Sequence, residues 1–182
     1  MSPKILLAAC AAALLVSHIA AATVDTNASK VRFIARQSDV AVEGAFARFS
    51  ADVDFDPARP QTGKVHVAID LASTDAGSGD ANRLIQGKEF FDVARFPGAT
   101  FDATAIAANG QGGFVARGPF TLKGHTQELV LPFTVRTDGA GTWLEGGAPL
   151  SRLAYHVGEG QWTDTSTLDD EVRIEFKLRL AK

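Results

Sequence analysis

The sequence predicts an all-β protein, an antiparallel, lipocalin-like barrel of about eight strands with one short helix. Three observations support this prediction. Apolar and polar residues alternate along several segments, turn-forming stretches separate those segments, and one connection is longer than the others. A period of two puts neighbouring side chains on opposite faces of a strand, so each segment has one buried and one wet face.

The alternating segments account for most of the chain. In the last of them the apolar residues fall at every second position: Val172, Ile174, Phe176, Leu178 and Leu180. Segments of this kind predict strands near residues 28–37, 41–55, 63–73, 98–108, 112–122, 127–137, 143–154 and 170–180. Most connections are short and rich in glycine, asparagine or proline, so consecutive strands are expected to pair antiparallel.

Closure into a barrel follows from the need to protect sheet edges. About eight antiparallel strands remove their edges by closing, and the interior then holds side chains or one small ligand. A β-sandwich is the alternative that the pattern leaves open. The sequence has no Cys-Trp-Cys spacing of the immunoglobulin type, which counts against one form of sandwich.

The long connection lies between Ser73 and Gly98 and is too long for a bare loop in a compact domain. It predicts a short helix over Asp80–Gln86, between the third and fourth strands. Asp80 is expected to cap the helix, and Leu84 and Ile85 to face inward. An aromatic loop follows the helix.

The first 22 residues are interpreted as a signal peptide, leaving one domain over residues 23–182. Lys4 precedes an apolar run over 5–16, and alanines 20–22 offer a cleavage site. A membrane anchor would need about 20 apolar residues, and Ser17 and His18 interrupt this run. Cys10 ends a stretch similar to a lipobox, but few apolar residues precede it. We expect ordinary cleavage after Ala22, with lipidation of Cys10 left open.

Composition excludes several classes of function. Cys10 is the only cysteine, and it leaves with the signal peptide, so neither a disulfide nor thiol chemistry is expected. The net charge of −3 argues against nucleic acid as a partner. His66, His125 and His156 show no metal-ligand spacing, and there is no G-x-S-x-G motif. We therefore predict no catalytic residue, no metal and no cofactor.

Four stretches of the chain resemble the YceI-like family, in the family's order. They are VEGAFARFSADVDFDP (42–57), KEFFDVARFPGATFDAT (88–104), GPFTLKGHTQELVLPFT (118–134) and LSRLAYHVGEGQWTDTSTLDDEV (150–172). The second stretch resembles the family's most recognisable block, in which F-F-D-V is followed by F-P-x-A-T-F. The resemblance covers essentially the whole chain after residue 22.

The resemblance implies a periplasmic lipocalin-like barrel whose long interior binds isoprenoid or other lipid chains, without catalytic activity. Its partner would be a hydrophobic small molecule, and we also expect transient membrane contact. The sequence leaves the oligomeric state open between a monomer and a homodimer, since an edge left by imperfect closure of the barrel can support a dimer. The sequence departs from the family at two places. Gln37 stands where many members have histidine, and His156–Val157 is more polar than the usual pair before Gly158. Both places lie where a head group is expected.

The aromatic residues have two interpretations. Four phenylalanines in the stretch from Glu89 to Thr104 either plug one end of the barrel as core or line a tunnel for a greasy ligand. The second interpretation gives a set of candidate tunnel residues: Phe33, Phe46, Phe49, Phe55, Leu84, Phe91, Phe101, Phe133 and Trp162. Candidate head-group contacts are Arg36, Gln37, Arg152 and His156, although arginines beside strands are often only ion-paired surface residues.

Three functions remain as hypotheses. The first is a carrier for a long-chain isoprenoid, either a quinone or a polyprenyl phosphate, bound by apolar burial. The second is a non-catalytic interaction protein that works with a membrane redox partner such as a cytochrome, and its barrel would be filled by side chains. The third is an enzyme that acts on a small lipid, for which the sequence offers no acid–base pair.

Overall fold

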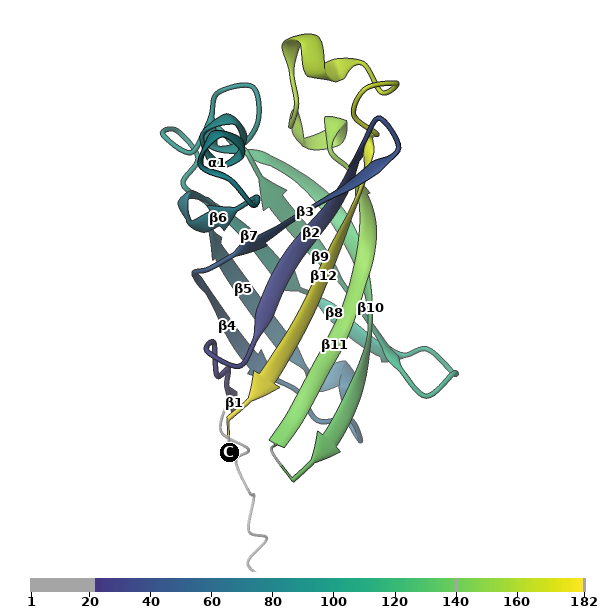
Figure 1. Ribbon diagram of the computed structural model, residues 1–182. Helices are drawn as coiled ribbons and strands as arrows, with labels where there is room; N and C mark the ends of the chain where they lie inside the picture. The colour runs from purple at the N-terminus through teal and green to yellow at the C-terminus, as the bar shows by residue number, and fades with distance from the viewer. Residues whose placement is uncertain (1–21, 140, 182) are drawn as a thin grey trace, which may run out of the picture.

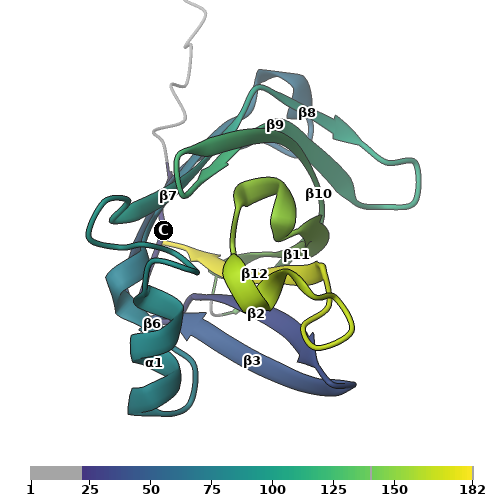
Figure 2. The same cartoon turned by 90° about the horizontal axis from the view of Figure 1, so that it is seen from above.

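The computed structural model describes residues 22–139 and 141–181, which form one curled antiparallel sheet (Figure 1). Along the sheet the strands follow the order β1-β4-β5-β7-β9-β10-β11-β12-β2-β3-β6, and β8 pairs with β9 beside β7. Seen from above, the strands surround a central axis (Figure 2). The predicted all-β, lipocalin-like class is confirmed.

The longer strands are β2 (Lys30–Gln37), β3 (Val40–Phe46), β4 (Phe49–Asp54), β5 (Lys64–Asp70), β7 (Gly98–Ala103), β9 (Phe114–Leu122), β10 (His125–Asp138), β11 (Gly141–Ser151) and β12 (Glu171–Leu180). The short ones are β1 (Ala22–Thr23), β6 (Thr74–Asp75) and β8 (Ala105–Ala108). One α-helix, α1 (Gly79–Gln86), and the 3-10 turns η1 (Pro60–Thr62), η2 (Leu71–Ser73), η3 (Leu153–Tyr155) and η4 (Gly160–Thr163) complete the described chain.

The predicted strand over 41–55 is two strands joined by a bend. The backbone of Ala47 and Arg48 leaves the ladder and bonds to the segment around Ser73, with the Arg48 N–H 2.9 Å from the Ser73 hydroxyl. As a result β3 pairs with β2, whereas β4 pairs with β5 on the other side. The bent chain thus connects the two ends of the strand order, where β3 and β4 lie.

The predicted strand over 98–108 is also divided, into β7 and β8. The carbonyl of Asp102 comes so close to Gly118 on β9 that any Cβ there would overlap it. Two further predicted strands end early: residues 71–73 and 153–155 turn into η2 and η3. The count of strands was therefore too low, because local breaks do not interrupt the apolar alternation.

The two short strands β1 and β6 lie at the two ends of the strand order. β1 pairs with β4, and Val24 bridges to Leu180 of β12, while β6 pairs with β3 at the other end. The C-terminal end of β12 and the short strand β1 lie at one end of the barrel, and α1 lies at the opposite end (Figure 1). The predicted signal peptide, apart from Ala22, lies outside the described residues.

The helix lies where the sequence predicts it, but its cap is different. Ser78, not Asp80, caps α1, because the Ser78 hydroxyl accepts a hydrogen bond from the Ala81 N–H at 3.1 Å. Asp80 lies in the first turn and pairs with Arg83. Within residues 22–139 and 141–181 no helix has the length and apolar character needed to cross a membrane.

Candidate ligand cavity

Two cavities lie one after the other inside the barrel. The upper cavity, at the end that carries α1, has a volume of about 180 Å³, and the lower one about 80 Å³. The lower cavity is lined only by apolar side chains, from Val31 to Leu178. The lining of the upper cavity is apolar except for Gln37, Arg152 and the indole of Trp162.

The alternation of β12 shows how the cavities follow each other along the axis. Val172 and Ile174 line the upper cavity, and Ile174, Phe176 and Leu178 line the lower one. A strand rises about 3.3 Å per residue, so this inward row spans roughly 20 Å. Ile174 lines both cavities and thus marks the partition between them.

The aromatic loop after α1 forms one wall of the upper cavity. The loop forms a compact turn that directs the rings of Phe90 and Phe91 inward. In this turn the Phe90 N–H donates to the Gly87 carbonyl, and the Phe91 N–H donates to the Ile85 carbonyl. The Phe91 ring lies 6.5 Å from that of Phe33 at 86°, and the Phe90 ring 5.4 Å from that of Trp162. These edge-on contacts are favourable aromatic geometries.

Gly44 on β3 determines where Phe33 lies. A Cβ at position 44 would overlap the Phe33 ring, which covers the glycine from across the β2–β3 pair. The absence of a side chain at Gly44 therefore leaves the space that the outer edge of the Phe33 ring occupies.

The four phenylalanines between Glu89 and Thr104 do not share one role. Phe90 and Phe91 line the upper cavity, and Phe101 lines the lower one. Phe96 lies outside both linings, with the guanidinium of Arg95 5.0 Å from its ring centre. Neither a single plug nor a single tunnel wall describes the stretch.

Residues 152–170, here called the capping segment, lie at the helix end of the barrel (Figures 1 and 2). Trp162, Val157 and Leu168 of this segment line the upper cavity. The segment contains η3 and η4 and has no strand ladder of its own, so its backbone groups need other partners.

Arg152 supplies many of those partners. Its side chain is buried, with 2% exposed, and all five guanidinium N–H groups point at backbone carbonyls. The acceptors, at 2.6–3.1 Å, are Val157, Gly158, Trp162, Leu168 and Asp169. Burial lowers the pKa of Arg152, and the carboxylates of Asp170 and Asp169 oppose that effect. Arg152 is therefore the internal support of the capping segment.

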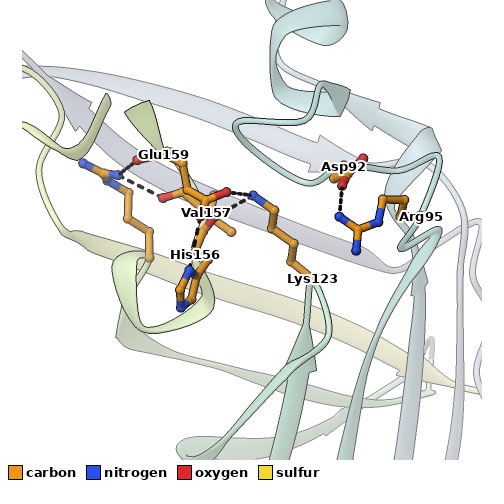
Figure 3. Close-up of polar contacts among 8 residues, drawn as sticks. Asp92, Arg95, Lys123, His156, Val157 and Glu159 are labelled. Carbon is orange, nitrogen blue, oxygen red and sulfur yellow. Dashed lines mark hydrogen bonds and ion pairs between the residues drawn. The ribbon is translucent and has the colours of Figure 1, made fainter. Parts of the chain in front are cut away.

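Lys123, in the turn between β9 and β10, holds the segment from outside (Figure 3). Its buried ammonium donates to the His156 carbonyl at 2.7 Å and to Glu159 at 2.9 Å. These contacts, first with Lys123 and then with His156, lower the pKa of Glu159. The His156 ring stacks on His125 at 4.1 Å. The Glu89 carbonyl accepts from the N–H groups of Gly158 and Glu159.

Most of the predicted tunnel residues surround the cavities. Phe33, Phe46, Leu84, Phe91 and Trp162 line the upper cavity, and Phe101 and Phe133 line the lower one. Phe49 and Phe55 line neither. Phe49 lies just after the bend, and Phe55 lies beyond the end of β4, where it packs on Phe114 and Phe133. Lipid contact at all nine of the predicted residues stays a prediction.

The candidate head-group residues are not equivalent. Gln37 and Arg152 line the upper cavity, whereas Arg36 and His156 do not. Arg36 is exposed, and its guanidinium donates to the Asp39 carbonyl. The guanidinium Nε of Arg36 lies 4.0 Å from the carboxylate of Asp169. His156 is exposed beside Glu159. The described residues contain no group of three or more potential metal ligands.

The sequence interpretation overlooked the aliphatic part of the lining. Ala35, Val42, Leu122, Leu150 and Val172 all face the upper cavity. The alternation that predicts the strands also assigns these residues to the inward face, so the pattern contained this information. The candidate tunnel residues were aromatic apart from Leu84, so this part of the lining was not predicted. Val157 and Leu168 lie outside strands, and no periodic signal identifies them.

A curled antiparallel sheet around an apolar interior, capped at one end by an ordered segment, defines the class of small lipocalin-like barrel proteins. The match to known families is specific within this class. The chain belongs to the YceI-like domain family, whose model matches residues 23–180.

Relatives agree with this assignment. A UPF0312 protein of Azotobacter vinelandii is 32% identical over 138 residues, which cover 72% of each chain. A UPF0312 protein of Shewanella oneidensis is 33% identical, and the match spans 53% of its length and 56% of this chain.

Solved structures show the same fold. Burkholderia cenocepacia BcnA is 41% identical, with a TM-score of 0.84 over 87% of this chain and 99% of that chain. A polyisoprenoid-binding domain from Saccharophagus degradans, implicated in plant cell wall breakdown, has a TM-score of 0.67 over 88% of this chain and 99% of that one. Its identity of 16% supports the fold alone.

Proposed function

We propose that this protein is a non-catalytic periplasmic carrier that holds the chain of a long isoprenoid lipid inside its barrel. The observation that carries this proposal is the pair of apolar cavities along the barrel axis, joined at Ile174. An apolar tunnel suits a flexible hydrocarbon chain better than a compact polar substrate. The S. degradans relative in fold, described as a polyisoprenoid-binding domain, supports the choice of chain.

Burial of the chain would supply most of the affinity. Each methylene that leaves water contributes about 0.8 kcal/mol, so several isoprene units bind without a charged anchor. The cavities, about 180 and 80 Å³, are smaller than the roughly 300 Å³ of ordinary ligand pockets. A long chain must therefore displace Ile174 and the nearby rings to occupy both.

The alternative of an interaction protein with a filled barrel has less support. That hypothesis requires side chains to occupy the interior, and the two cavities do not fit it. We also propose export through the predicted signal peptide with cleavage after Ala22, and no cofactor other than the lipid itself.

The test is native mass spectrometry of protein expressed with its own leader and purified from the periplasm, followed by organic extraction. We expect a stoichiometric isoprenoid, and an intact mass that corresponds to cleavage after Ala22. Ala35 faces the upper cavity, whereas Ala41 is exposed on β3. Ala35→Phe should therefore lose the lipid, and Ala41→Phe should keep it.

Protein that is purified without lipid, and that takes up neither ubiquinone nor a polyprenyl phosphate when offered, would contradict the carrier function. Circular dichroism of both variants must first show a folded barrel, since extra volume in a packed interior can destabilise it.

A further inference from the structure

The few polar groups of the upper cavity bear on the head group of the lipid, and this step rests on the proposed function. Gln37, Arg152 and Trp162 are the residues with polar side-chain atoms in that lining. In a mostly apolar pocket, such groups fix the orientation and the chemical identity of the ligand. Whether each of them is free to bind therefore matters.

Arg152 is the one charged residue in the described lining, and it has no donor to offer. Its five N–H groups already bond to carbonyls of the capping segment. A phosphate on the lipid would have to break some of these bonds and leave buried carbonyls unpaired, which is unfavourable. Arg152 therefore does not serve as an anion site.

Trp162 and Gln37 differ in access. The indole Nε1 of Trp162 is covered and has no hydrogen-bond partner in the described chain, so the ring must turn before it can donate to a ligand. Gln37 ends β2 at the rim, and its side chain is exposed to solvent there. The described residues give its side-chain amide no partner. An amide both donates and accepts hydrogen bonds without charge.

The surroundings of the rim disfavour a phosphate further. The capping segment contains four carboxylates, those of Glu159, Asp164, Asp169 and Asp170. Its arginine, Arg152, already donates all of its hydrogen bonds to backbone carbonyls. Nearby cations are also occupied: Lys123 pairs with Glu159, and Arg36 lies 4.0 Å from Asp169. Lys88 is exposed after α1, outside the lining, with no carboxylate of the described residues within 4.0 Å.

We propose that the cavity selects an isoprenoid whose head group is an uncharged hydroxyl or carbonyl over the same chain with a phosphate, and that the Gln37 amide binds this head group. The free amide can satisfy either oxygen. Because Arg152 has no free donor and the capping segment is acidic, the negative charge of a phosphate would have no cation to balance it.

The experiment compares geranylgeraniol with geranylgeranyl phosphate, which share one hydrocarbon chain, by equilibrium dialysis below their aggregation concentrations. The wild-type protein, stripped of lipid, is expected to bind the alcohol about tenfold more tightly than the phosphate at low salt. The ratio should shrink as salt screens the acidic segment.

Variants at position 37 test the residue itself. Gln37→Leu should weaken alcohol binding by about three- to tenfold, the worth of one hydrogen bond. Gln37→Arg places a free cation at the rim and should shift the preference toward the phosphate by about tenfold. Gln61→Arg, exposed in η1 at the other end of the barrel, is the matched control and should change neither affinity.

Three outcomes separate the two proposals. If neither probe nor ubiquinone binds, the carrier function fails, and this inference fails with it. Equal or tighter binding of the phosphate by the wild type overturns the inference and leaves the carrier function intact. If Lys88→Gln abolishes such phosphate binding, the phosphate site belongs to Lys88 at the rim, not to Gln37.

Discussion

Arg152 shows how one side chain organises a segment that has no strand ladder. The guanidinium is planar and carries five N–H groups in a fixed arrangement. In this protein all five meet carbonyls from both halves of the capping segment, between Val157 and Asp169. Lysine, with three donors on one atom, cannot reproduce this geometry.

Replacement of Arg152 by methionine should therefore be costly. The change keeps the apolar stem and removes every donor, so several buried carbonyls lose their partners. We expect the free energy of unfolding in urea to fall by about 3 kcal/mol or more. Amides of residues 152–170 should lose hydrogen-exchange protection more than those of β9 and β10.

Arg117 provides the matched control. It is exposed on β9, 4.0 Å from Glu128, so Arg117→Met should change stability by no more than about 0.5 kcal/mol. Equal stability loss in the two variants, or unchanged protection of the capping segment in Arg152→Met, would contradict the structural role of Arg152.

The capping segment as an element depends on contacts with three other parts of the fold. β2 contacts the segment through the β-bridge between Gln37 and Leu168. The aromatic loop contacts it through the Glu89 carbonyl, and the β9–β10 turn contacts it through Lys123. These partners are far from the segment in sequence. Nothing in the local pattern could therefore predict its conformation, although the sequence analysis gave Trp162 as a candidate tunnel residue.

Acid should loosen this segment through Glu159. Lys123 and His156 lower the pKa of Glu159, so its contribution to stability is complete above the ordinary pKa and is lost as the pH falls through the lowered value. We expect protection factors of the Gly158 and Glu159 amides to decrease in that acidic range.

Glu159→Gln removes the carboxylate. In this variant the protection factors of the amides at 158 and 159 should be lower at neutral pH and should change less as the pH falls. Glu128→Gln, an exposed carboxylate 4.0 Å from Arg117, should keep the wild-type profile. An unchanged profile in Glu159→Gln would show that other carboxylates, such as Glu175 beside Arg32, dominate the acid response.

At the level of the whole molecule, the sequence predicted the barrel because inward and outward residues keep their phase along most strands. That same regularity concealed the bend at Ala47–Arg48 and the break between β7 and β8. At the bend, Ser73 takes over the backbone partners, and the break follows from close contact at Gly118. Both depend on residues distant in sequence. The cavity lining was predictable where it comes from strands, as at Val172, and unpredictable where it comes from loops.

The division of the interior at Ile174 sets the order in which a ligand that enters at the helix end would reach the two cavities. A lipid tail that enters at the helix end first meets the upper cavity and must pass Ile174 to reach Phe176 and Leu178. In the proposed carrier, the polar end of the lipid would then stay near Gln37, at the helix end of the barrel. Tail position inside the barrel is therefore the property that most clearly separates a carrier from a protein with an ordinary core.

Photo-crosslinking with an isoprenol that carries a diazirine at the tail end measures this position directly. Peptide mapping by mass spectrometry should place the label on lower-cavity residues of β12 and β9, such as Phe176 or Phe120. Label confined to exposed apolar residues outside both linings, such as Val40 and Val130, or spread over the outer surface, would contradict binding of the chain inside the barrel.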